Sequence, residues 1–187
     1  MMNKRKFSNN KLPVVENEYI EKILKISRVN KVVKGGKRMS FRAFVIVGDG
    51  KGQVGIGLGK SKEVPIAIKK GIDRAKKAFH KIHTVGGTVP HEVVGKFGAS
   101  RVLIKPAKHG TGVIAGGAVR VILEALGLED VVAKSLGSGN AINNARATLN
   151  GLNQMVMHEN EVKRRGKSLS VNSDILSSIQ SKGTINE

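Results

Sequence analysis

Apolar and polar positions in the first half of the chain follow the pattern of β-strands joined by tight turns. Residues 40–47 (SFRAFVIV) and 53–58 (QVGIGL) are rich in large apolar side chains, which predicts two strands. Asp49-Gly50 between them can supply the positive φ of a hairpin turn. Residues 23–33 predict an earlier strand, and residues 34–38 (KGGKR) predict the turn that follows it.

The strand predicted over residues 53–58 alternates large apolar residues with glycine. The alternating positions are Val54, Gly55, Ile56, Gly57 and Leu58. One face of this strand would pack on a core, while the other carries almost no side chains. A bulky group can approach the backbone closely on such a face.

Residues 63–82 have the apolar period of a helix. Its apolar positions are Val64, Ile68, Ile72, Ala75, Phe79 and Ile82. Ser61 is the expected N-cap, with Pro65 in the first turn. The opposite face is basic, which fits either a solvated surface or contact with a polyanion. Its charged residues are Lys69, Lys70, Asp73, Arg74, Lys76, Lys77 and Lys81.

A strand–helix rhythm repeats after residues 83–90 (HTVGGTVP), a glycine-containing joint. The pattern predicts a strand over 101–105, a helix over 113–126, a strand over 131–136 and a helix over 141–155, with the helices on one face of a second sheet. From 158 onward the chain is polar, with a basic run at 163–167, and we expect it to be poorly ordered or to order on a partner.

The charge is large and uneven. The chain carries a net charge of +19, which indicates a polyanionic partner. Residues 1–83 contain 21 Lys and Arg against 6 Asp and Glu, whereas residues 84–187 contain 12 against 8. The first half should therefore hold most of the electrostatic contacts, and the second half should bind through shape, backbone and protein contacts.

Cysteine is absent, which excludes disulfides, thiolate metal sites and cysteine nucleophiles. No apolar run approaches the roughly 20 residues that span a membrane. Residues 1–11 are basic without a following apolar stretch, so we expect a tail that threads among phosphates and not a secretory signal.

Nucleotide-binding motifs occur in the wrong context. Gly50, Gly52 and Gly55 match the spacing GxGxxG, but that motif must join a strand to a helix, and here it lies in a predicted hairpin. Residues 59–61 (GKS) resemble the end of a phosphate-binding loop, but Val54 stands where that motif needs glycine. We expect neither a dinucleotide nor an NTPase site.

Other catalytic patterns are also missing. His80 and His83 have a spacing found in zinc sites, but no further ligands accompany them. There is no GxSxG nucleophile motif and no evident carboxylate pair. The sequence therefore predicts a protein that is not an enzyme and that has no cofactor or metal.

Three loops combine glycine with cations, at residues 34–38, 48–51 and 105–112. Glycine lets backbone N–H groups approach phosphate, and Lys or Arg neutralises its charge. Aromatic residues are few, so base stacking is not expected. Recognition of folded RNA through shape and backbone fits better.

These motifs resemble the bacterial-type small-subunit ribosomal protein five family over roughly residues 20–168. Two departures are His109, where an acidic residue is common, and Ala141, where proline is common. The resembling blocks are 27–38 (SRVNKVVKGGKR), 47–62 (VGDGKGQVGIGLGKSK), Glu63-Val64-Pro65, 110–120 (GTGVIAGGAVR), 134–138 (KSLGS), 146–148 and 165–168 (RGKS).

The resemblance implies an α+β fold. Residues 20–84 would form a double-stranded-RNA-binding-like α/β layer and residues 85–157 a β-α-β-type domain. Residues 1–19 would be a basic tail, and residues 158–187 a polar one.

The resemblance also implies a structural constituent of the small subunit, in the cytoplasm. Such a protein would bind small-subunit ribosomal RNA, contact small-subunit proteins four and eight, support assembly and influence decoding accuracy near the messenger-RNA entry. Residues 32–38 would lie near the spectinomycin site, and residues 110–120 toward protein four. No membrane or small-molecule substrate is implied.

Two sets of site residues follow from the loops and the resemblance. The expected RNA contacts are Arg28, Lys31, Lys34, Gly35, Gly36, Lys37, Arg38, Lys51, Lys60, Lys62 and Lys108. The expected protein interface consists of Gly110, Gly112, Gly116, Gly117 and Arg120. Arg120 should point away from its helix core, to pair with a carboxylate across an interface, to contact phosphate or to remain solvated.

Two alternatives remain open. One is a free-standing module that binds double-stranded RNA or DNA. The other is a phosphotransferase related through the fold of the second domain, although fold alone does not give function. Co-migration with the small subunit would separate both from a ribosomal protein.

Overall fold

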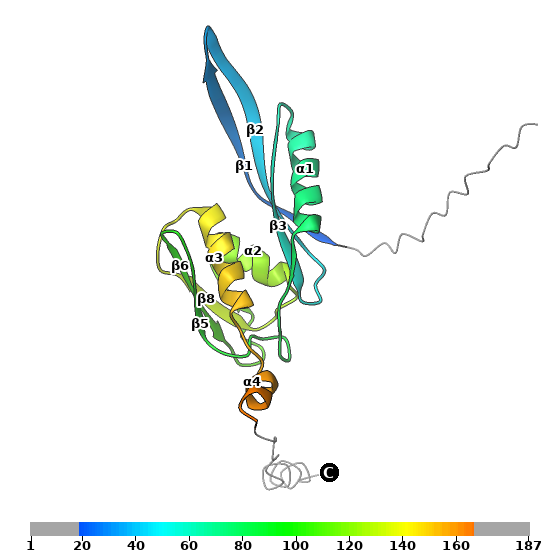
Figure 1. Cartoon of the computed structure of the whole chain (residues 1–187), viewed down its shortest axis with the longest axis vertical. Coiled ribbons are helices and arrows are strands. Elements are labelled where there is room, and N and C mark those ends of the chain that lie inside the picture. Colours follow the sequence, from blue (N-terminus) through cyan, green and yellow to red (C-terminus); the bar gives the residue numbers. More distant parts are fainter. Residues whose placement is uncertain (1–18, 167–187) are drawn as a thin grey trace, which may run out of the picture.

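The computed structural model describes residues 19–166 and is a mixed α+β fold (Figure 1). Its first half is an antiparallel sheet in the order β1-β2-β3-β4, with helix α1 against one face. These elements are β1 (Ile20–Val33), β2 (Gly36–Gly48), β3 (Gln53–Ser61), α1 (Val64–Lys77) and β4 (Phe79–Lys81).

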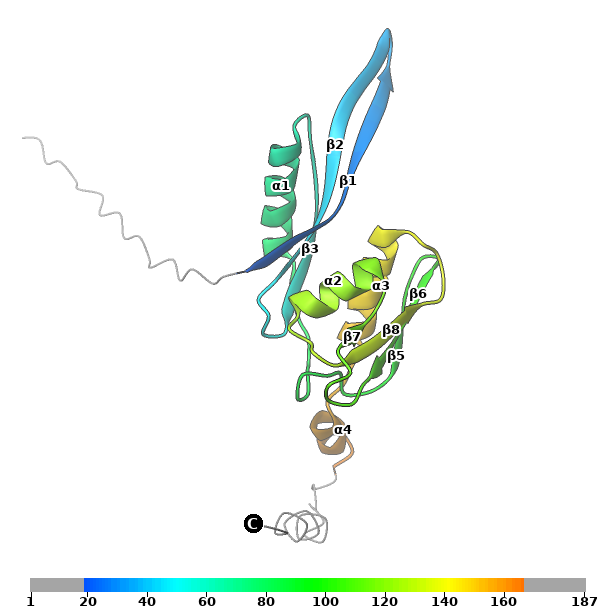
Figure 2. The same cartoon turned by 180° about the vertical axis from the view of Figure 1, so that it is seen from behind.

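The second half contains a mixed sheet in the order β5-β6-β8-β7, in which β7 and β8 are parallel. Helices α2 and α3 pack on it, and α4 stands beyond the body of the protein (Figure 2). The elements are β5 (Val93–Phe97), β6 (Ser100–Pro106), β7 (Val113–Ile114), α2 (Gly117–Ala125), β8 (Val131–Ser135), α3 (Ala141–Asn153) and α4 (His158–Arg164).

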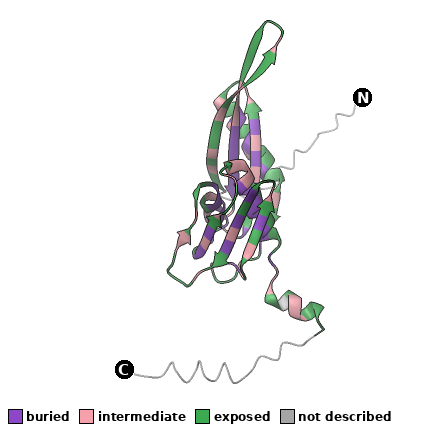
Figure 3. Cartoon of the chain, turned by 90° about the vertical axis from the view of Figure 1, so that its left-hand side faces the viewer, coloured by how far each residue is buried: buried purple, intermediate pink, exposed green. Residues whose placement is uncertain are grey.

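The two halves share one core. Phe44 and Ile46 of β2 join the same buried cluster as Ile122 of α2 and Ile104 of β6. Alternate residues of β2 enter a smaller cluster against α1 instead. Residues 43–48 of β2 are therefore buried on both faces of the sheet, and Figure 3 shows buried residues in purple along the strands. The N-terminal sheet lies between α1 on one face and α2 and α3 on the other.

The glycine face of β3 is covered by α1. A Cβ built on Gly57 would lie 1.8 Å from the carbonyl oxygen of Gly71, and one on Gly59 would lie 1.8 Å from that of Ala67. The bulky group predicted to approach this backbone is therefore a helix of the same chain. This face of β3 is not available to an external ligand.

The predicted helix over residues 63–82 is too long. The helix ends at Lys77, Phe79–Lys81 forms β4, and Glu63 rather than Ser61 is the N-cap. Ser61 is instead the last residue of β3. The apolar period continued past the helix end because Phe79 packs in the smaller core from a strand.

The remaining predicted elements differ from the structure mainly at their ends. Residues 92–107 form a hairpin of two strands, β5 and β6. The helix predicted over 113–126 starts only at Gly117, because Val113–Ile114 is β7. Ala141 starts α3 without proline, since the side chain of Asn140 accepts a hydrogen bond from the Ile142 amide at 3.1 Å.

The C-terminal segment begins with a short helix. Residues 158–164 form α4, within the segment from 158 onward that the sequence predicted to be poorly ordered or to order on a partner. The basic tail predicted over residues 1–19 lies outside the described residues except for Tyr19, and residues 167–187 of the predicted polar tail also lie outside them. Within residues 19–166, no helix has the length and apolar character required to cross a membrane.

Candidate nucleic-acid interface

Strands β1 and β2 extend beyond the rest of their sheet. The last pair between β2 and β3 is Phe41 with Ser61, so residues 29–33 and 36–40 pair only with each other. We call residues 29–40 the hairpin ribbon; it projects from the molecule in Figure 1. At its tip Gly35 has a φ of +82°, and a Cβ there would meet no atom within 4 Å.

The predicted cations are divided between the two faces of this hairpin. Lys31 lies directly opposite Arg38. Because side chains alternate along a strand, this pair shares the face of Phe44, which points toward the second half of the chain. Arg28 and Lys37 lie on the α1 side by the same alternation.

One cation on the face that carries Phe44, Arg42, was not among the expected RNA contacts. Arg42 lies directly opposite Lys60, and it shares the face of Arg38, four residues earlier on the same strand. One side of the sheet thus carries two pairs of like charges, Lys31 with Arg38 across β1 and β2 and Arg42 with Lys60 across β2 and β3. Such pairs destabilise a sheet unless an anion compensates them.

No anion within the described chain compensates the ribbon. There is no Asp or Glu between Glu21 and Asp49. Within residues 19–166, the side chains of the ribbon cations form no ion pair or hydrogen bond. Val32 is 75% exposed, so aliphatic surface is also open. The ribbon is therefore suited to a polyanion with an apolar component, such as a sugar-phosphate backbone.

Lys51 lies at the opposite end of the sheet from the ribbon. β2 has 13 residues, which corresponds to roughly 40 Å. The amides of Gly50 and Gly52 in this turn donate to the carbonyls of Ala125 and Leu126 at 3.1 and 3.0 Å. These two N–H groups are used inside the chain, so the expectation that glycine frees them for phosphate is wrong here. The exposed side chain of Lys51 remains available.

Lys62 and Lys108 are also exposed but do not belong to the ribbon. Lys62 lies between β3 and α1, close in sequence to Lys60. Lys108 lies in the loop between β6 and β7. The structure thus distributes the predicted RNA contacts over at least three places, of which the hairpin holds the largest group.

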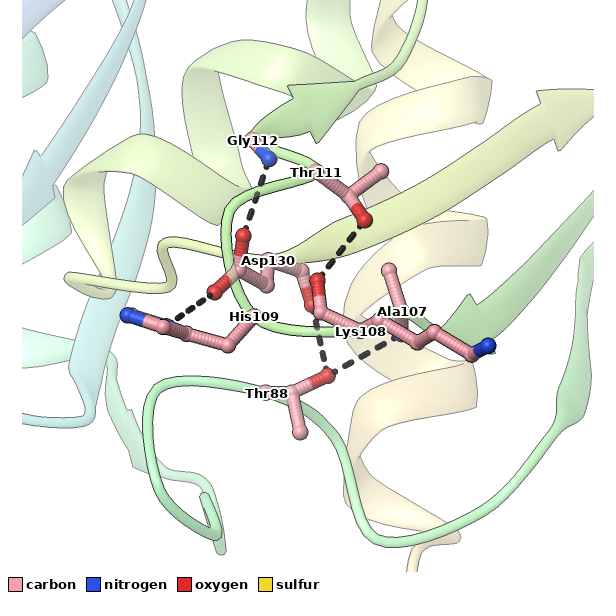
Figure 4. Close-up of polar contacts among 7 residues, drawn as sticks. All are labelled: Thr88, Ala107, Lys108, His109, Thr111, Gly112 and Asp130. Carbon is pink, nitrogen blue, oxygen red and sulfur yellow. Dashed lines mark hydrogen bonds and ion pairs between the residues drawn. The ribbon is translucent and has the colours of Figure 1, made fainter. Parts of the chain in front are cut away.

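The loop that carries Lys108 is held by a buried aspartate (Figure 4). Asp130 is 4% exposed, and its carboxylate accepts a hydrogen bond from the Gly112 amide at 2.9 Å. Nδ1 of His109 lies 3.1 Å from the other carboxylate oxygen. His109 therefore has a partner within the chain at a position where the family resemblance implied an acidic residue.

The amide of Gly112 holds the pKa of Asp130 below its ordinary value; His109 and the Gly110 amide act in the same direction, against burial. Because the pKa of Asp130 is lower in the folded than in the unfolded protein, the charged carboxylate stabilises the fold at pH values above its unfolded pKa. This stabilisation is lost in acid below about pH 4, as the pH falls through the pKa of the folded protein.

Asp130→Asn should therefore lower the thermal unfolding midpoint by several degrees at pH 6.5, and the difference from the unchanged protein should shrink toward pH 3. Thermal unfolding followed by circular dichroism at both pH values measures this. Asp73→Asn, at an exposed carboxylate of α1, is the control. A difference that is the same at both pH values would contradict the role of the charge.

The glycines predicted for a protein interface lie on an open surface. A Cβ built on Gly110, Gly112, Gly116 or Gly117 would meet no atom within 4 Å. Ile114 between them is 55% exposed. The segment therefore presents backbone and one aliphatic side chain without covering groups from residues 19–166. This geometry permits close approach by another molecule.

Arg120 pairs within its own helix. Its Nε donates to Oε1 of Glu124 at 2.8 Å, while Nζ of Lys22 on β1 donates to Oε2 of the same carboxylate. The hydrogen bond from Lys22, and to a lesser extent the one from Arg120, holds the pKa of Glu124 below its ordinary value. A carboxylate was expected across an interface, whereas the structure pairs Arg120 with Glu124, four residues along the same helix. Helix side chains at this spacing contact each other, so the sequence alone allowed this pair.

The rejected enzyme motifs remain without a suitable geometry. Gly50, Gly52 and Gly55 lie in a turn and in β3, with no helix start behind them. His80 has Nδ1 3.4 Å from the amide nitrogen of Asn153. Among residues 19–166, no group of three His, Asp or Glu side chains is placed to hold a metal ion.

Comparison with known protein families identifies both halves. The family described as "Ribosomal protein S5, N-terminal domain" matches residues 19–83, and the one described as "Ribosomal protein S5, C-terminal domain" matches residues 95–165. The two matches follow each other in the expected order and together cover more than half of the chain. The resemblance found in the sequence is confirmed. The chain therefore belongs to the ribosomal protein S5 family, whose members are structural proteins of the small ribosomal subunit.

Proposed function

We propose that this protein binds small-subunit ribosomal RNA through the hairpin ribbon and thereby supports assembly of the subunit. The observation that carries the proposal is the pairing of Lys31 with Arg38 on one face, where no carboxylate of residues 19–166 forms an ion pair with either side chain. Like charges directly opposite each other are unfavourable, and phosphates bound between them would remove that cost. The ribosome in question would be the bacterial-type cytoplasmic one.

The other predicted cations add contacts around this centre. Lys34, Gly35 and Gly36 would place the tip against the RNA backbone, near the spectinomycin site. Arg28 and Lys37 would contact RNA from the α1 side, so the ribbon would lie between two RNA segments. Lys51, Lys60, Lys62 and Lys108 would bind phosphates elsewhere.

The open glycine segment of the second half supports a protein contact. We assign Gly110, Gly112, Gly116 and Gly117 to an interface with small-subunit protein four, while protein eight would bind elsewhere on the chain. Arg120 would act there together with Glu124, to which it is already paired. Through this interface, near the messenger-RNA entry, the protein would influence decoding accuracy. The organisation into domains 20–84 and 85–157 belongs to the same proposal.

A salt titration tests the RNA contact. Lys31→Gln and Arg38→Gln should each lower the slope of log affinity against log salt by about one, because each removes one phosphate contact. The measurement uses the full-length protein and RNA extracted from purified small subunits. Unchanged slopes for both variants would remove the ribbon from the interface. Equal affinity for generic RNA or DNA duplex would favour a free-standing binding module instead.

A further inference from the structure

A hollow of about 280 Å³ lies in the corner where the N-terminal sheet meets α3. Phe44 and Leu58 line it from the sheet, and Phe97 and Arg146 line it from the second half of the chain. The hollow therefore exists only because both halves are folded together. Its floor is apolar, since Phe44 and Leu58 also contribute to the shared core.

Cations stand on both sides of this hollow. Arg42 and Lys60 lie two residues beyond Phe44 and Leu58 on the same sheet face, which places them roughly 7 Å further along the strands. On the other side, the guanidinium of Arg146 lies 5.1 Å from the centre of the Phe97 ring. The corner thus has an apolar floor and basic walls.

No carboxylate balances these walls. The residues that line the hollow include neither Asp nor Glu. Within residues 19–166, none of Arg42, Lys60 and Arg146 forms an ion pair. Arg42 and Lys60 are moreover directly opposite each other, a costly arrangement without an anion. The charge of the corner is complementary to a chain of phosphates.

We propose that this corner, between Arg42 and Lys60 on one wall and Arg146 on the other, holds a strand of RNA backbone. Phosphates would lie between the two walls, and ribose would pack on the apolar floor. The inference rests on the proposed function for the class of ligand, and it adds a contact that includes the second half of the chain. RNA backbone matches the corner better than a protein partner, because Arg42, Lys60 and Arg146 have no ion-pair partner within residues 19–166 and RNA carries a phosphate at every nucleotide.

A matched pair of variants at Ala78 tests the corner. Ala78 lines the hollow, is exposed and has an ordinary φ of −119°. Ala78→Glu adds an anion there, whereas Ala78→Gln adds the same bulk without charge. We expect Ala78→Glu to bind RNA extracted from small subunits about tenfold more weakly than Ala78→Gln, the size of one charged contact. Equal affinities would overturn the proposal.

A second variant keeps the test independent of that substitution. Arg146→Gln should lower the salt slope of RNA binding by about one. Lys69→Gln, on the side of α1 away from the sheet, should not change it. Thermal unfolding of each variant shows whether it is folded. An unchanged slope for folded Arg146→Gln would overturn the proposal.

The outcomes separate this inference from the function on which it rests. If the ribbon variants lower the slope and the corner variants do not, the ribbon binds RNA and the corner does not. If neither set changes RNA binding, both the proposed RNA-binding function and the corner proposal that rests on it are wrong. If the corner variants bind RNA normally but fail to enter the small subunit, a protein occupies the corner, and the RNA proposal is wrong.

Discussion

Reversing the charges of Lys31 and Arg38 together is expected to weaken RNA binding at least about 100-fold near 0.1 M salt. Each charged contact contributes about 1.5–3 kcal/mol, and 1.4 kcal/mol corresponds to a factor of ten. Both side chains belong to the projecting ribbon and contact no other described residue through ion pairs or hydrogen bonds. Their loss should therefore leave the fold intact. The measurement is a binding titration of Lys31→Glu/Arg38→Glu with RNA extracted from small subunits.

The control for this double variant has the same net charge. Lys69→Glu/Lys77→Glu changes two exposed cations on α1, on the other face of the sheet. If binding depends on the ribbon, this control should lose much less affinity. An equal loss in both proteins would mean that only the total charge of +19 attracts the RNA.

The largest effect on stability is expected at Gly57. A Cβ at this position would lie 1.8 Å from the carbonyl oxygen of Gly71 and 2.8 Å from the amide of Ala75, both backbone atoms of α1. The helix must move away from the sheet to admit it. Gly57→Ala should therefore cost about 1–3 kcal/mol or more, against the about 5–15 kcal/mol that stabilises a domain.

Urea denaturation of Gly57→Ala and Gly139→Ala measures this cost. A Cβ on Gly139 would meet no atom within 4 Å, and the φ of Gly139 is not positive. Its replacement should therefore change stability by less than about 0.5 kcal/mol. Similar denaturation midpoints for the two variants would contradict the close packing of α1 on β3.

The sequence predicted the strands of the first half because alternation and turn glycines are local signals. Residues 23–33, 40–47 and 53–58 all lie within strands of the structure. The end of α1 was not predictable in the same way. Phe79 continues the apolar period of the helix, yet it packs in the core from β4, and only the tertiary arrangement decides between the two.

The candidate site was partly visible in the sequence. Lys31 and Arg38 were predicted from the glycine–cation loops and the family resemblance, but their arrangement as a directly opposed pair required the strand register. Arg42 was missed for the same reason. The amides of Gly50 and Gly52 donate to Ala125, the last residue of α2, and to Leu126, about 75 residues away in the chain, so no local pattern could reveal that they are occupied.

Contacts of the second half likewise divide into those visible in the local sequence and those that depend on the fold. The pair of Arg120 and Glu124 has the spacing of helix neighbours and was readable from the sequence. The contact of His109 with Asp130 joins two loops through the fold, and it could not be read from local spacing. The hollow beside Arg146 depends on both halves and has no sequence signal of its own.

Tethered cleavage shows whether the hairpin ribbon lies against RNA in the assembled small subunit. Because the chain has no cysteine, Met39→Cys introduces a unique attachment point at an exposed ribbon position. An iron chelate attached there should cut the RNA backbone of assembled subunits at a few clustered positions, whereas a chelate at Lys69→Cys should not cut those positions. Subunits that incorporate the Met39→Cys protein without any such cuts would contradict the account.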